Sequence, residues 1–65
     1  MDYRKLCLSV HYEMVQAHEH AILGHWSREP ADAEYHYNQI VANLNKAAAA
    51  LGFDLVKREK KDEAA

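Results

Sequence analysis

The feature that most constrains the fold of this chain is a histidine at a strict seven-residue interval, His11, His18 and His25. At about 100° per residue, positions seven apart lie on one column of a helix. Apolar columns lie on both sides of that line: Cys7, Met14 and Ala21, with Tyr3, Val10 and Ala17 next to them, and Leu8, Val15 and Ile22 on the other side. Because this apolar arc is wider than one neighbouring helix can cover, the pattern predicts a seam where several helices meet.

Residues 2–26 are predicted to form the first helix, because they contain no proline and no glycine before Gly24. Asp2 is a residue type that favours the N-cap. The segment from Gly24 to Pro30 interrupts the pattern, and we expect a turn over 27–29. Ser27 or Glu29 is expected to cap the next helix, whose first turn tolerates Pro30.

The second helix is predicted over 30–51. Its apolar stripe recurs at steps of three and four residues: Ala33, Tyr37, Ile40, Val41, Leu44, Ala47, Ala48 and Leu51. Gly52 is expected to end this helix, with Phe53 folding back toward Ala48 in a Schellman motif. Residues 53–56 are predicted to be a short extended segment over the open end of the hairpin, and 57–65 a charged, flexible tail. Residues 1–56 then form the structured hairpin.

A short turn makes the two helices antiparallel neighbours, so the predicted fold class is an all-α two-helix hairpin. Facing residue numbers should sum to roughly 56 in this arrangement. The expected facing pairs are Tyr3 with Leu51, Cys7 with Ala48, Met14 with Val41, and His20 with His36. A lone hairpin leaves much apolar surface in water, and we therefore predict a homodimer, a two-fold symmetric four-helix bundle. Its predicted interface residues are Leu8, His11, Val15, His18 and Ile22.

The length of 65 residues permits only a thin core. Chains this short usually need disulfides, a metal or a partner subunit. Cys7 is the only cysteine, which excludes a disulfide framework and is typical of a reducing cytosol. Since Cys7 lies on the apolar arc, we expect it to be a small buried hydrophobe. We find neither a signal-peptide pattern nor an uncharged apolar stretch of about 18 residues, and expect no membrane span.

A formal net charge of −2 argues against a protein that binds nucleic acid by neutralising phosphates. Half of the eight basic residues lie in the tail, at Lys57, Arg58, Lys60 and Lys61. Outside the tail, a basic face would have to be built from Arg4, Lys5, Arg28 and Lys46. An RNA-binding helical bundle, in the manner of small plasmid copy-control hairpins, is retained as an alternative.

The simplest hypothesis for the histidines is that they are half-buried residues at the rim of the helix interface. Two further hypotheses give them a function. Histidine changes its charge between about pH 5 and 8, so a column of histidines at a dimer seam could respond to protons. Weak candidates for metal ligands are His20 with His36 and Cys7 with His11, because a site would have to be assembled between helices. No catalytic set is found, and we expect neither an enzyme nor a bound cofactor.

Aromatic residues near the turn are candidates for binding a partner protein. Tyrosine and tryptophan anchor protein interfaces because they combine a large apolar area with a polar tip. The candidate partner-binding residues are Tyr12, His25, Trp26, Tyr35 and His36. The structural alternative is that Trp26 packs against the turn and Tyr37 packs in the hairpin core.

Residues 38–55 resemble small early proteins of Mu-like temperate phages, a group that includes a quorum-sensing anti-activator built as a helical-hairpin dimer. The matching pattern consists of Leu44, the alanine pair Ala47 and Ala48, and then Ala-Leu-Gly ending at Leu51 and Gly52. The resemblance implies a hairpin dimer that inhibits host proteins, including transcriptional regulators and pilus ATPases, by direct binding. It covers these architectural residues and no partner-binding residue.

The leading hypothesis is therefore a non-enzymatic homodimer from a phage or mobile element. It would act in the cytoplasm of a bacterial host by binding and blocking a host protein, such as a transcription regulator. The alternatives are the RNA-binding bundle and a histidine-based dimer that responds to pH or metal.

Overall fold

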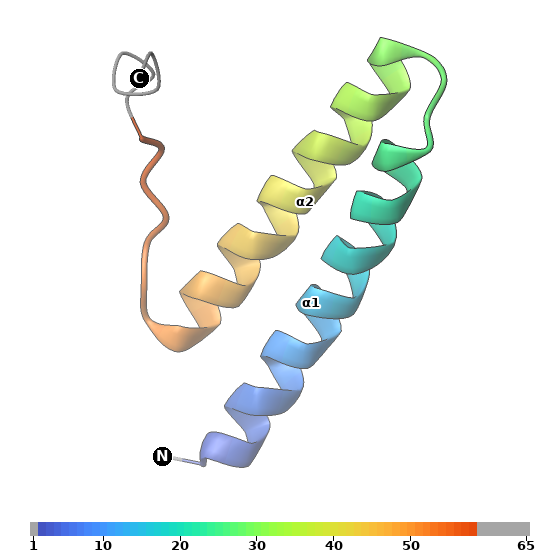
Figure 1. The fold of residues 1–65 in the computed structure, drawn as a ribbon. Coiled ribbons are helices and arrows are strands. Elements are labelled where there is room, and N and C mark those ends of the chain that lie inside the picture. Colours follow the sequence, from blue (N-terminus) through green and yellow to red (C-terminus); the bar gives the residue numbers. More distant parts are fainter. Residues whose placement is uncertain (1, 59–65) are drawn as a thin grey trace.

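The computed structural model describes residues 2–58, which form a hairpin of two antiparallel helices (Figure 1). Helix α1 comprises Tyr3–His25 and helix α2 comprises Pro30–Leu51. The predicted all-α two-helix hairpin is confirmed, and α1 starts one residue later and ends one residue earlier than expected. The part of the predicted tail over 59–65, with Lys60 and Lys61, lies outside the described residues.

A polar cap begins α1, and a glycine cap ends α2. Asp2 is the N-cap of α1, and its carboxylate accepts a hydrogen bond of 3.0 Å from the backbone N–H of Arg4. Gly52 follows α2 at a φ of 89°, a left-handed conformation that glycine adopts without steric cost. Phe53 donates its N–H to the carbonyl of Ala48 at 2.8 Å, and Gly52 to that of Ala49 at 3.1 Å. These two bonds confirm the predicted Schellman motif.

The expected side-chain cap of α2 is wrong. Glu29 is the N-cap residue but makes no side-chain capping hydrogen bond. The hydroxyl of Ser27 instead donates to the carbonyl of Leu23, 2.7 Å away, and so belongs to the end of α1. Pro30 in the first turn needs no capping partner for its nitrogen, and Asp32 adds favourable negative charge there.

The seam between the helices combines small, polar and apolar residues. Its partly or fully shielded positions recur every three or four residues: Leu6, Val10, Glu13, Ala17, His20 and Gly24 on α1, and Ala33, His36, Ile40, Asn43 and Ala47 on α2. Among the described residues, only Ala17 and Ala47 are buried, with 8% and 3% of their surface exposed. A Cβ added to Gly24 would lie 3.2 Å from the Cβ of His36, which shows how closely the helices approach near the turn.

Two expectations about burial are wrong. The Cys7 thiol is exposed, and the stripe expected on the second helix is divided. Ala47 lies in the seam, whereas Tyr37, Val41 and Leu44 remain exposed. The physical reason is that a single neighbouring helix covers only a narrow strip at an average spacing of 3.5 residues. Residues about a quarter turn away from that strip stay in contact with solvent.

The extended segment after α2 also differs from its expected position. Leu55 and Val56 line a shallow hollow together with Tyr37, Val41 and Asn45 of α2. The segment therefore runs back alongside α2 rather than over the open end of the hairpin (Figure 1). Over residues 2–58, neither helix combines the length and the hydropathy required to cross a lipid bilayer.

Enlarging a seam alanine should separate the helices. We expect Ala47→Leu to lower the free energy of unfolding by about 1–3 kcal/mol, because three additional carbon atoms must enter a contact that is already closed. Ala42→Leu adds the same atoms at an exposed position of α2 and is the control. Urea unfolding followed by circular dichroism at one fixed chain concentration measures both changes. Equal stabilities for the two variants would contradict the close seam.

Candidate interaction surface

One side of the hairpin carries a set of apolar residues, which we call the apolar face: Tyr3, Cys7 and Met14 of α1, and Tyr37, Val41, Leu44 and Leu51 of α2. All seven residues are exposed. A helix turns by about 100° per residue, so on each helix these residues lie roughly 80° around the helix axis from the centre of the seam. Because the helices are antiparallel and the two offsets have the same sign, both sets turn toward the same side of the hairpin.

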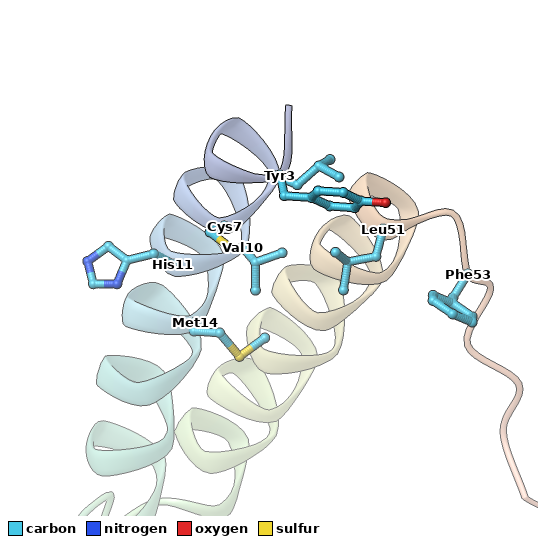
Figure 2. Close-up of a pocket in the computed structure, with 8 residues that line it drawn as sticks. Tyr3, Cys7, Val10, His11, Met14, Leu51 and Phe53 are labelled. Carbon is cyan, nitrogen blue, oxygen red and sulfur yellow. The ribbon is translucent and has the colours of Figure 1, made fainter. Parts of the chain in front are cut away.

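The open end of the apolar face contains a hollow of about 510 Å³. Its lining residues are Tyr3, Leu6, Cys7, Val10, His11, Met14, Leu51 and Phe53. Figure 2 shows Tyr3, Val10 and Met14 extending toward Leu51, whereas the ring of His11 points away from α2. Tyr3 and Leu51, an expected facing pair, therefore lie at the same hollow. The hollow is an apolar gap between two helices rather than an enclosed site.

The predicted dimer-interface residues form a second exposed strip, on α1 alone. Leu8, Val15 and Ile22 lie about 180° from the seam, on the side of α1 that faces away from α2. His11 and His18, also exposed, lie between this strip and the apolar face. The strip and the apolar face together give α1 two apolar surfaces that the hairpin leaves uncovered.

Inside the seam, His20 and His36 come together from the two helices. Their Nδ1 atoms are 2.9 Å apart, a hydrogen-bond distance, and their ring centroids are 5.2 Å apart. This contact confirms the facing predicted from the helix register. The ring of Tyr35 meets both imidazoles edge-on, with centroids 6.2 Å from His20 and 5.1 Å from His36.

A second polar pair in the seam was not identified from the sequence. The side-chain amide of Asn43 donates a hydrogen bond of 2.9 Å to the carboxylate of Glu13. The antiparallel register of the helices could have predicted this pair, because the residue numbers 13 and 43 have the same sum as 20 and 36. The two pairs stand about 10 Å apart along the helices and satisfy polar groups that face each other in the seam.

The four candidate metal ligands form two separate pairs. Cys7 and His11 border the hollow at the open end, whereas His20 and His36 lie nearer the turn. Within residues 2–58, no group of three or more histidine, cysteine or acidic side chains could hold a metal ion together.

The candidate partner-binding residues are spread over more than one patch. Trp26 is 76% exposed, and its ring meets that of His25 edge-on at 4.9 Å. Tyr35 and His36 form the aromatic group with His20, while Tyr12 lies about 12 Å from His20 along α1, toward the N-terminus. Trp26 is therefore an exposed aromatic residue at the turn. The alternative that Tyr37 packs in the hairpin core is wrong, since 54% of its surface is exposed.

Comparisons with protein-family models, with curated proteins and with solved structures find no match for this chain. The resemblance of residues 38–55 to phage early proteins stays a prediction.

A double-mutant cycle should detect the coupling between His20 and His36. We expect an interaction free energy of about 0.5–1.5 kcal/mol from His20→Ala, His36→Ala and the double variant at neutral pH, the usual net value of one hydrogen bond. The matched control is a second cycle with His18→Ala in place of His20→Ala. His18 is exposed on the outer column and should show no coupling to His36. Equal coupling in both cycles would contradict a specific contact.

Proposed function

We propose that this chain is a small, non-enzymatic interaction protein of a phage or mobile element. Two copies pair through their apolar surfaces into a four-helix bundle, and the dimer binds and inhibits a protein of the bacterial host, such as a transcription regulator. The observation that carries the proposal is a contrast within residues 2–58, where the buried core consists of two alanines and large apolar side chains are exposed around it.

The size of the core supports pairing. Burying a valine, leucine, isoleucine or methionine side chain stabilises a fold by about 1.5–3 kcal/mol, and an alanine contributes much less. Met14, Val41, Leu44 and Leu51 are only partly covered in the single hairpin. A second copy laid on the apolar face, beside the segment with Leu55 and Val56 that already lies along Tyr37 and Val41, would increase their burial. It would supply the hydrophobic stabilisation that a chain of 65 residues otherwise lacks.

The turn end supports a separate site for the host protein. Trp26 lies beyond the end of α1, and Tyr35 lies about 120° around α2 from Val41. A dimer built on the apolar face therefore leaves both aromatic residues accessible. Tryptophan and tyrosine are enriched among the few residues that dominate binding energy at protein interfaces. The resemblance of residues 38–55 to phage anti-activators agrees with inhibition by direct binding in the bacterial cytoplasm.

Pairing can be tested by sedimentation equilibrium. We expect the wild-type protein at micromolar concentration to have twice its chain mass of 7.5 kDa. Leu44→Glu should reduce that mass toward a single chain, with or without loss of helix, because it places a charge in the apolar face. Ala42→Glu, at an exposed position outside that face, is the control and should remain dimeric. A folded wild-type monomer, or a dimeric Leu44→Glu variant, would overturn the pairing.

Host binding can be tested by affinity capture from a bacterial lysate. We expect the tagged dimer to retain one dominant protein, which is then purified and titrated. Trp26→Ala and Tyr35→Ala should each weaken its binding by about tenfold or more, as interface anchors do, while the protein stays dimeric. Arg28→Ala at the same turn is the control. An empty capture, or equal affinities for all variants, would refute the inhibitor hypothesis and leave the dimer hypothesis unaffected.

A further inference from the structure

We propose that His20 and His36 form a two-histidine binding site for a divalent transition-metal ion, with Zn²⁺, Ni²⁺ and Cu²⁺ as the suitable class. The site would clamp α1 to α2 near the turn. Both protein ligands come from one chain, so the site does not require the proposed dimer, although Tyr35 of the proposed host-binding surface packs against both rings.

The spacing of the two rings carries this inference. An imidazole nitrogen binds Zn²⁺ at about 2.0–2.1 Å, so two imidazoles on one tetrahedral ion have centroids roughly 5 Å apart. The centroids of His20 and His36 are already 5.2 Å apart. Their Nδ1 atoms now face each other at 2.9 Å. Turning the rings so that both lone pairs converge on one point would admit an ion without separating the helices.

The positions of the protons on the two neutral imidazoles also permit an ion to bind between them. In the neutral pair, one Nδ1 carries the proton of the hydrogen bond and the other accepts it. When the donor ring moves that proton to its Nε2, both Nδ1 lone pairs become free, with no net release of protons. Acid opposes binding, because metal-ligating histidines must be neutral.

The seam holds both ligands in position before an ion arrives. Both side chains are half-buried and come from regular helix rather than from a loop. Gly24 lets α1 approach the Cβ of His36, since an added Cβ would stand 3.2 Å from it. The ring of Tyr35 packs edge-on against both imidazoles. This preorganisation reduces the entropy lost on binding.

The chemistry of the donors selects the ion. Imidazole suits zinc, copper and nickel, whereas magnesium and calcium require oxygen ligands. Because the described part of the chain brings no third ligand to the pair, water or an external group would complete the coordination. The outer histidines provide a built-in comparison: His11, His18 and His25 stand about 10 Å apart on one column, too far to share an ion within one chain.

The test uses the untagged full-length chain and ZnCl2 in isothermal titration at neutral pH. We expect one ion per chain and a zinc-dependent rise in melting temperature. His20→Ala and His36→Ala should each abolish the rise, whereas His18→Ala and His25→Ala should retain it. MgCl2 should have no effect on any variant. A rise that survives both seam substitutions, or no saturable zinc binding, would overturn the site and leave the pair as a hydrogen bond only.

A second measurement needs no variant and so does not depend on the folding of the alanine proteins. In NMR spectra of the wild-type protein, zinc should shift the ring resonances of His20 and His36 at concentrations that leave His18 and His25 unchanged. Equal shifts of all the histidines would identify nonspecific surface binding and contradict the proposal. Host capture and dimer mass are separate readouts, so failure here is distinguishable from failure of the proposed function.

Discussion

The close approach of α1 and α2 along a seam of small residues is the constraint on which the rest of the structure depends. Ala17 and Ala47 occupy the buried positions, and Gly24 allows the same closeness next to His36. Small residues let two helix backbones come near each other but bury little apolar area. The helices therefore approach closely at these positions without acquiring a hydrophobic core of ordinary size.

This seam moves the large apolar residues to the outside. Once Ala17, Ala47 and the polar pairs occupy positions between the helices, Met14, Val41 and Leu44 lie beside the seam and stay exposed. This exposed apolar area is the physical basis of the proposed pairing of two copies.

The polar pairs give the seam a unique register. Glu13 with Asn43 and His20 with His36 are each satisfied only when the two helices align at one relative position. A slide of one helical turn would break both hydrogen bonds and leave four half-buried polar groups without their partners in the seam. The same contact that fixes the register places two imidazole nitrogens where one ion could join them.

The sequence by itself determined the two helices, their antiparallel pairing and the glycine ending of α2, because periodicity, turn length and the Gly52 signal are local properties. It also predicted the facing of His20 and His36, which follows from register alone. The tertiary structure decided which of several apolar columns enters the seam. That choice placed Cys7 and Tyr37 outside and Asn43 inside, because the energy of packing two helices depends on how closely their backbones can approach, and hydrophobic periodicity does not record that distance.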